Sequence, residues 1–164
     1  MSVITGERRL FAEVFAGLAG RFGPIEMMSP LFSFDHTDYY REEFGEGLLR
    51  RFISFERPVP PDELADLKLF TNGVEETYRR DDGRRRVNID PGYLTLERLV
   101  LASCKNFTHR IYLGRGVYAD LTLVYRDGEF RALEWTFPDY IDQRAFGFLH
   151  GVRRRYARKI GRGL

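Results

Sequence analysis

The sequence has a single cysteine, Cys104, among its 164 residues. One thiol forms no internal disulfide and cannot supply the thiolates of a Cys-based zinc site. Three histidines are present (His36, His109 and His150), without the spacing of metal-ligand motifs such as H-E-x-x-H. We therefore expect no metal site, and the cofactor is left unknown.

Long apolar runs are also missing. No stretch without Asp, Glu, Lys or Arg exceeds eight residues, whereas a membrane-spanning helix needs about 20 apolar residues. Residues 1–9 contain no apolar core of the kind that a secretory signal needs. From these two absences we expect no membrane partner and a cytoplasmic location.

Familiar catalytic motifs are absent as well. The sequence has no G-x-x-x-x-G-K-[ST] loop, and the glycines of residues 17–23 lack its lysine and a preceding strand. It also has no G-x-S-x-G nucleophile elbow. P-loop NTPase, α/β-hydrolase and zincin functions are therefore disfavoured.

What the chain does have is apolar and aromatic bulk, with 43% hydrophobic and 15% aromatic residues. A chain of this length buries enough surface for a real core, so we expect a single domain over residues 1–164. The net charge is +2, but residues 141–164 carry seven basic residues against one acidic residue. That segment predicts an anionic partner.

Apolar residues at helical spacing predict three main helices, over residues 7–22, 62–79 and 142–160. In the last of them we expect Phe146, Leu149, Val152, Tyr156 and Ile160 to form the apolar stripe. A short helix capped by Thr37 and closed at Gly45 is also expected.

Short apolar segments between turn residues predict strands. We expect them at residues 25–34, 48–56, 86–90, 99–103, 110–113, 117–125 and 130–137, although 99–103 is also compatible with a helix. The last three form a β-meander, in which Asp127-Gly128 is a strong hairpin turn that sets Tyr125 opposite Phe130 and Asp120 opposite Trp135. The predicted class is α+β, with a single antiparallel sheet, helices mostly on one face, the C-terminal meander and a terminal helix.

Two early segments combine titratable and hydroxyl groups. The first runs from residue 35 to 43, and its candidates for ligand binding are Asp35, His36, Thr37, Tyr39, Tyr40 and Glu43. A capped helix entry with inward tyrosines is the alternative. In the second, Lys68, Asn72 and Glu75 lie along one helix face and form either the polar wall of a cleft or an ordinary solvated face.

Three later segments complete the candidates. Asn88, Asp90 and Tyr93 follow a strand, and Gly92 beside them would let a ligand approach the backbone; a simple strand-ending turn is the alternative. The run 103–110 offers Ser103 and a cluster of Lys105, His109 and Arg110 for an anion, or else only a basic loop. Trp135, Asp139 and Tyr140 form either an aromatic platform or a packed strand end.

Together these segments resemble a prokaryotic family known as domain of unknown function 4416. The resemblance rests on residues 34–40, 68–75, 88–93, 109–113 and 135–140, and it covers nearly the whole chain. It implies no particular activity, and the sequence has neither a P-loop nor the guanine motif [NT]-K-x-D that a GTP-binding protein would show.

Three functions remain in competition. The first is an enzyme or binding domain for a small phosphorylated or nucleotide-like ligand, with Asp90, His109 and Lys105 as catalytic candidates and Arg110 as an anion-holding residue. The second is an RNA- or DNA-associated accessory protein whose basic C-terminal helix presents Arg153, Arg154, Arg155, Arg158 and Lys159 to phosphates. The third is a protein-interaction module with an aromatic surface.

Overall fold

A computed structural model describes residues 1–34, 44 and 47–162 of the chain. Contacts between Cα atoms divide the chain into two compact units. Unit 1 comprises residues 1–59 and 69–90, and unit 2 comprises residues 60–68 and 91–164. The expectation that residues 1–164 fold as one domain stays a prediction.

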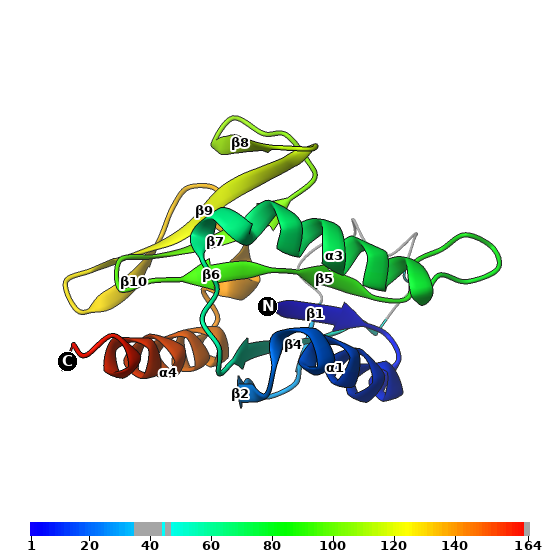
Figure 1. The fold of residues 1–164 in the computed structure, drawn as a ribbon, viewed down its shortest axis with the longest axis horizontal. Helices are drawn as coiled ribbons and strands as arrows, with labels where there is room; N and C mark the ends of the chain where they lie inside the picture. The colour runs from blue at the N-terminus through cyan, green and yellow to red at the C-terminus, as the bar shows by residue number, and fades with distance from the viewer. Residues whose placement is uncertain (35–43, 45–46, 163–164) are drawn as a thin grey trace. The chain divides into compact units, whose positions relative to one another are not determined.

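Unit 1 is built on an antiparallel sheet whose strands come from distant parts of the chain (Figure 1). Its order is β2-β4-β1-β5, and β3 also pairs with β4. The strands are β1 (Ser2–Thr5), β2 (Ile25–Met28), β3 (Phe32–Ser33), β4 (Leu49–Phe55) and β5 (Asn88–Asp90). The first strand is fully buried and central, since Val3 pairs with Arg51 on one side and with Ile89 on the other.

Helix α1 (Arg8–Phe22) supplies the apolar layer of unit 1. Its buried residues recur at helical spacing: Leu10, Phe11, Val14, Phe15, Leu18 and Phe22. The helix ends at Gly23, which has a φ of 87° and donates its N–H to the carbonyl of Ala19 at 2.9 Å. The predicted helix over residues 7–22 is therefore confirmed to within one residue.

A second helical segment crosses from one unit to the other. It begins with a 3₁₀ turn, η2 (Pro61–Glu63), and continues as α3 (Leu64–Thr77). Residues 64–68 of α3 belong to unit 2 and residues 69–77 to unit 1. This confirms the predicted helix near residues 62–79, although the α-helix itself begins at Leu64 and ends at Thr77.

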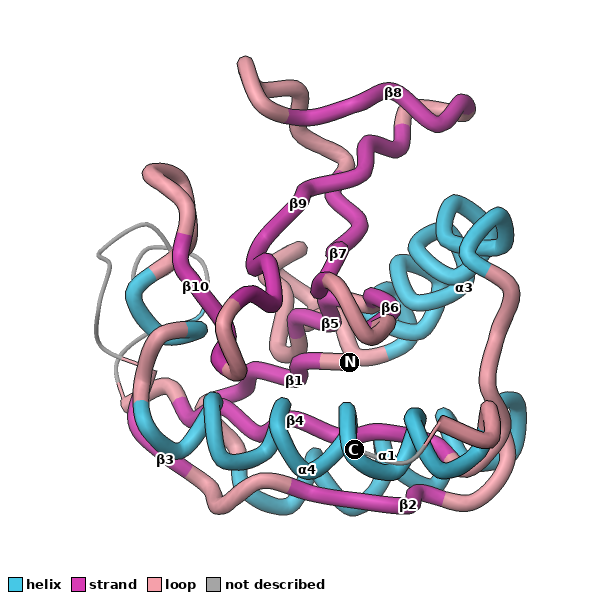
Figure 2. The backbone as a smooth tube through the Cα atoms, turned by 90° about the vertical axis from the view of Figure 1, so that its left-hand side faces the viewer, coloured by secondary structure: helices cyan, strands magenta, loops and turns pink. Residues whose placement is uncertain are grey.

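Unit 2 holds the second antiparallel sheet, in the order β10-β9-β7-β6, with β8 also paired to β9. Its strands are β6 (Gly92–Leu94), β7 (Arg98–Ser103), β8 (Arg110–Gly114), β9 (Val117–Arg126) and β10 (Glu129–Ala132). Figure 2 shows β7 and β10 on opposite sides of β9. Among the described residues there are thus two five-stranded antiparallel sheets together with the helices, so the α+β class is confirmed and the expectation of a single sheet is wrong.

The long strand β9 has one edge that is shared by two other strands. Ala119 pairs with Ala102 of β7 and with Ile111 of β8, while Leu123 pairs with Leu99 of β7 and with Ala132 of β10. Because β7 occupies one edge along this length, β8 and β10 share the other. A gap is left between them beside residues 121 and 122.

The meander is confirmed in its turns but not in its last strand. Asp127 and Gly128 have φ values of 53° and 83°, as a two-residue hairpin turn requires, and Tyr125 pairs with Phe130. However, β10 ends at Ala132, so residues 133–137 lie outside the sheet ladder. The predicted pairing of Asp120 with Trp135 is wrong for that reason.

Gly92 has a role other than the expected one. A Cβ atom at this position would lie 2.5 Å from the carbonyl oxygen of Val100 and 2.8 Å from the Leu101 side chain. The strand pairing of β6 with β7 therefore explains the glycine, because Gly92 faces Leu101 directly. It serves the close approach of two strands rather than of a ligand.

The last helix, α4 (Gln143–Lys159), follows the 3₁₀ turn η3 (Pro138–Tyr140). Asp142 caps it by accepting a hydrogen bond from the N–H of Arg144 at 2.8 Å. Its buried residues are Ala145, Phe148, Leu149, Gly151, Arg153 and Ala157. Of the predicted stripe, Leu149 is buried, Phe146, Val152 and Tyr156 are half-buried and Ile160 is exposed, so the stripe is confirmed only in part.

Candidate functional site

The predicted site residues fall into three groups. Those of the first segment lie outside the described residues: Asp35, His36, Thr37, Tyr39, Tyr40 and Glu43. A second group lies in and beside unit 1, on α3 and β5. The third lies in unit 2 around the start of β8, and it forms the tighter chemical constellation.

In unit 1, Glu75 of α3 lies at the centre of a polar network and is only 4% exposed. One carboxylate oxygen accepts the N–H of Ile89 at 2.7 Å, and the other lies 3.2 Å from Nη1 of Arg85. The same Arg85 nitrogen donates to Oδ1 of Asn88 at 3.3 Å, and Nδ2 of Asn88 donates to Asp90 at 2.8 Å. These bonds fasten α3 to β5, and both carboxylate oxygens of Glu75 are used in doing so.

The α3 face that holds Glu75 is buried. Lys68 and Glu75 are 6% and 4% exposed, and Asn72 between them is half-buried. The alternative of a solvated face with ordinary surface pairs is therefore wrong for Lys68 and Glu75.

In unit 2, two predicted residues, His109 and Arg110, contact the same carboxylate oxygen of Asp120. Nε2 of His109 lies 3.0 Å from Oδ2 of Asp120, and Nε of Arg110 donates to the same oxygen at 2.9 Å. The side chains of His109, Arg110 and Asp120 are only 8%, 10% and 5% exposed. A buried aspartate thus joins the imidazole and the guanidinium, and its charge is balanced by Arg110.

The sheet register explains why these groups meet. Arg110 begins β8 directly opposite Asp120 of β9, and His109 immediately precedes it. The remaining oxygen of Asp120, Oδ1, accepts from the hydroxyl of Thr122 at 3.2 Å. Asp120 is therefore held from both sides and cannot turn away from His109 without losing these bonds.

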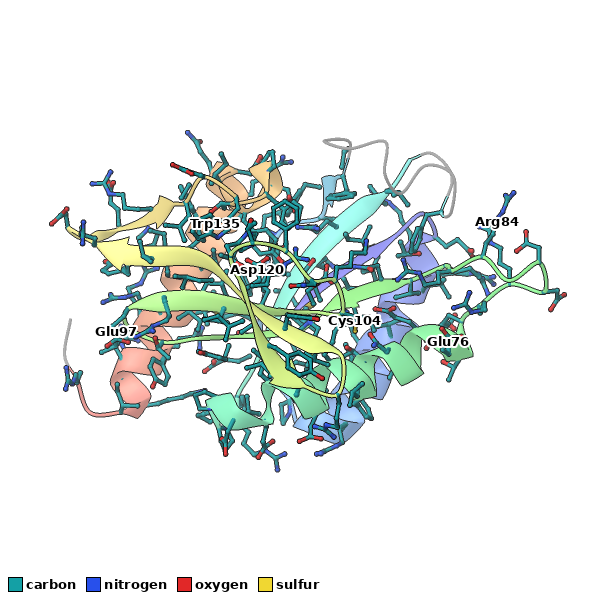
Figure 3. All side chains as sticks on the ribbon, turned by 90° about the horizontal axis from the view of Figure 1, so that it is seen from above. Glu76, Arg84, Glu97, Cys104, Asp120 and Trp135 are labelled. Carbon is teal, nitrogen blue, oxygen red and sulfur yellow. The ribbon has the colours of Figure 1, made fainter. Side chains whose placement is uncertain are left out.

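Trp135 completes the site from the segment that follows β10, and it lies near Asp120 in Figure 3. Its ring is stacked on His109 with the centroids 4.5 Å apart and the planes only 7° from parallel. The indole N–H donates to the backbone carbonyl of Leu121 at 2.7 Å, and the hydroxyl of Thr136 donates to the backbone carbonyl of Thr122 at 2.6 Å. Residues 135 and 136 thus fill the gap between β8 and β10 at the edge of β9.

The bond to Asp120 fixes the chemistry of His109. A carboxylate accepts hydrogen bonds, so Nε2 carries the proton and Nδ1 of the neutral ring is an acceptor. That Nδ1 atom is buried and has no hydrogen-bond partner among the described residues. An unmade bond of this kind costs about 1–3 kcal/mol, so the fold retains an unfavourable feature at this ring.

The rim of the site is a turn formed by residues 104–109. Nη1 of Arg110 holds it by donating to the carbonyl of Lys105 at 2.9 Å, and the N–H of Arg110 donates to the carbonyl of Phe107 at 3.0 Å. The side chain of Lys105 is exposed, and Phe107 is 61% exposed while its ring packs edge-on against His109 at 5.5 Å. Nη2 of Arg110 makes no hydrogen bond to any described residue.

Other predicted residues lie apart from this cluster. Ser103 accepts the N–H of Lys105 and shapes the turn, and Tyr93 is half-buried on β6. Asp139 and Tyr140 are each 2% exposed in η3, so they are not surface contacts. Asp90 belongs to unit 1, where Asn88 binds it.

The basic C-terminal segment divides into one inward arginine and several outward cations. Arg153 is 9% exposed, donates from Nε to the carbonyl of Leu96 at 2.8 Å, and lies 3.4 Å from the ring centroid of Tyr125. It therefore serves the packing of α4 in unit 2. The exposed members of the predicted surface are Arg154, Arg155, Arg158 and Lys159.

One residue of the site, Asp120, is not among the predicted site residues. It is the only charged residue between Val117 and Tyr125 of a strand that is otherwise apolar or uncharged. An isolated carboxylate in such a strand is itself a signal, because a buried charge needs a partner. The two-residue turn that joins β8 to β9, together with the register shift between Tyr112 and Gly114, also places Asp120 opposite Arg110.

A family model described as Domain of unknown function (DUF4416) matches residues 1–156. The chain belongs to this family. No curated protein and no solved structure matches the chain. Within the described part of the sequence, no helix is long and apolar enough to cross a membrane, and no cluster of three or more His, Cys, Asp and Glu side chains is arranged to hold a metal ion.

Proposed function

We propose that the chain binds a small phosphorylated or nucleotide-like ligand at the His109 site of unit 2. The observation that carries the proposal is the buried Nδ1 atom of His109, which has no partner among the described residues while Nε2 is bound to Asp120. A fold without a use for Nδ1 would have no reason to keep this atom buried and unsatisfied, since buried polar atoms are nearly always satisfied.

The charges at the site support an anionic ligand. Arg110 keeps one terminal nitrogen unused by the described residues, and Lys105 extends from the same turn into solvent. Among the described residues, Asp120 is the carboxylate that pairs with Arg110, and Lys105 adds a second cation on the same turn. Arg and Lys are the usual partners of phosphate oxygens.

His109 is also the best-supported acid–base group of the three that the sequence suggested. An aspartate that holds one imidazole nitrogen leaves the other to accept or deliver a proton, as in hydrolases with an Asp–His pair. Lys105 would then hold the ligand rather than exchange protons, because its side chain is exposed. Asp90, bound by Asn88 in unit 1, lacks a comparable arrangement.

A nucleic-acid role is the second candidate, and the exposed Arg154, Arg155, Arg158 and Lys159 favour it. Cations in the last turns of a helix also offset its macrodipole, which gives them a structural role. The two candidates separate by residue, because phosphate contacts made by α4 would be lost on removing these four charges and not on changing His109.

The experiment uses the single tryptophan of the chain, Trp135, as a reporter that is stacked on His109. Tryptophan fluorescence is followed during titration with inorganic phosphate, ribose 5-phosphate, AMP and polyphosphate, and with ribose and adenosine as uncharged controls. We expect a saturable change with at least one phosphate compound. Saturation at 100 times its Kd should also raise the unfolding free energy by about 2.7 kcal/mol.

Two variants with matched controls assign the change to the site. Lys105→Ala should abolish it or weaken it at least tenfold and His109→Phe should weaken it, whereas Lys159→Ala and His150→Phe, which alter an exposed lysine and a histidine of α4, should leave it intact. A titration in which no phosphate compound changes the fluorescence, or in which both site variants respond like the wild type, contradicts the proposal.

A further inference from the structure

The His109 site offers a ligand both a hydrogen-bond donor and a hydrogen-bond acceptor. Two donors, Nε2 of His109 and Nε of Arg110, bond to the same oxygen of Asp120 at 3.0 and 2.9 Å and therefore lie less than 6 Å apart. Each donor belongs to a planar group in which one further nitrogen makes no bond to the described residues. For Arg110 this is Nη2, a donor, and for His109 it is Nδ1, an acceptor.

A ligand that uses both atoms must present an acceptor to Nη2 and a donor to Nδ1. A phosphate group supplies the acceptor, and its charge matches the guanidinium and the neighbouring Lys105. It does not by itself satisfy Nδ1, because a fully ionised phosphate has no proton to donate. A hydroxyl group on the carbon next to the phosphoester does so with an ordinary O–H···N hydrogen bond.

Stacking of a nucleobase on the covered face of Trp135 is less compatible with the geometry. That face is occupied by His109 at 4.5 Å, and the indole N–H is engaged by Leu121. A base would have to displace the imidazole that the ligand needs. The site therefore favours binding of a phosphate and a neighbouring hydroxyl over stacking of an aromatic ring.

We infer, building on the proposed function, that the ligand is a phosphate monoester with a hydroxyl next to the phosphoester carbon. The phosphate binds Nη2 of Arg110 together with Lys105, and the hydroxyl donates to Nδ1 of His109. Asp120 is the positioning residue, because its bond to Nε2 keeps Nδ1 an acceptor. Because Nδ1 is buried and Phe107 packs edge-on against the imidazole, the hydroxyl reaches Nδ1 only if Phe107 gives way.

Two small probes isolate the hydroxyl. Glycerol 2-phosphate carries hydroxyl groups next to its phosphoester carbon, and methyl phosphate carries none. We expect the wild-type chain to bind glycerol 2-phosphate about 3- to 10-fold more tightly than methyl phosphate in Trp135 fluorescence titrations, the range of a single net hydrogen bond. In His109→Phe the two affinities should become equal, and in Lys105→Ala both should weaken while their ratio is kept.

Each remaining outcome has one meaning. Binding of both probes with equal affinity to the wild-type chain overturns the assignment of the hydroxyl to His109 and leaves the proposed phosphate site standing. A ratio that persists in His109→Phe also overturns it. Failure of both probes, while another phosphate compound still changes the fluorescence, overturns the inference alone. Failure of every phosphate compound overturns the proposed function itself, and the inference with it.

Discussion

A buried carboxylate beside an arginine occurs in both units, as Glu75 in unit 1 and as Asp120 in unit 2, and the hydrogen bonding around the two differs. Glu75 in unit 1 and Asp120 in unit 2 are each 4% exposed. Around Glu75, each carboxylate oxygen has a hydrogen-bond partner, and the bonds tie a helix to a strand. Around Asp120 the carboxylate is satisfied, but the imidazole that it holds keeps an unpartnered nitrogen among the described residues.

The difference separates a structural network from a functional one. A satisfied buried network adds rigidity and fixes one arrangement of the fold. A network that leaves a polar atom buried without a partner lowers stability, and proteins concentrate such costs at sites that meet a ligand. The two units therefore predict opposite responses to mutation, the first mainly in stability and the second mainly in binding.

The largest effect is expected at Glu75. Replacing Glu75 with Ala leaves the N–H of Ile89 and the guanidinium of Arg85 without their acceptor. Breaking a buried charged pair from one side costs about 3–5 kcal/mol, to be measured as unfolding free energy in urea. The control is Glu76→Ala, whose exposed carboxylate meets Arg79 on the surface and should cost far less, because surface ion pairs add little to stability.

Equal stability losses in these two variants would contradict a structural role for the Glu75 network. A loss at Glu75→Ala that matches the expectation, with phosphate binding by Trp135 fluorescence unchanged, would sharpen the contrast with the His109 site.

A smaller effect is expected at Glu7, which precedes α1 and accepts two bonds from Arg86, at 2.8 and 2.6 Å. The hydrogen bond from Arg86 lowers the pKa of Glu7 from 4.5 to about 2. Its contribution is therefore present above pH 4.5 and is lost as the pH falls towards 2.

We expect Glu7→Gln to lower the unfolding free energy at pH 7 by up to about 1 kcal/mol, since the carboxylate is partly exposed. The difference between variant and wild type should shrink as the pH is lowered through 4. A constant difference across that range would show that the carboxylate charge is not responsible.

A weaker pH effect is expected from His150 of α4. Burial, followed by the charges of Arg154 and Arg153, lowers its pKa, while Glu129 opposes them. The unfolded chain then binds the proton more readily, so stability should decline as the pH falls below about 6.5. His150→Phe, which keeps ring contacts with Tyr125 and Phe130, should remove this component of the pH profile; an unchanged profile would refute the assignment.

The smallest change in stability is expected at the proposed functional residue. His109→Phe keeps the stack on Trp135 and removes the unpartnered nitrogen, while Asp120 still accepts from Arg110 and Thr122. The lost bond to Asp120 and the relieved burial of Nδ1 should offset each other to within about 1 kcal/mol. A loss above about 2 kcal/mol in urea unfolding would place His109 with the structural residues.

Much of the fold was predictable from local patterns. The helices α1, α3 and α4 follow apolar spacing, and the Asp127-Gly128 turn fixes the register of β9 with β10. The existence of two sheets was not predictable in this way. It depends on β1 entering between β4 and β5, a pairing of segments about 50 and 85 residues away that no local pattern specifies.

The site was predictable in its parts but not in its assembly. His109, Arg110 and Trp135 stood out as polar or aromatic residues at strand ends, whereas Asp120 was passed over inside a strand. The early end of β10 explains the remaining error. It frees Trp135 from the ladder, so that its ring can stack on His109 instead of facing Asp120 across a strand pair.

The most direct test of the central claim is a nitrogen-15 NMR measurement of the histidine ring nitrogens, with the His109 signals assigned by their absence in His109→Phe. For the neutral imidazole of His109 we predict a protonated Nε2 and an unprotonated Nδ1, and a shift of the Nδ1 signal when glycerol 2-phosphate is added. A proton on Nδ1 in place of Nε2, or an Nδ1 signal that no phosphate compound moves, would contradict the account.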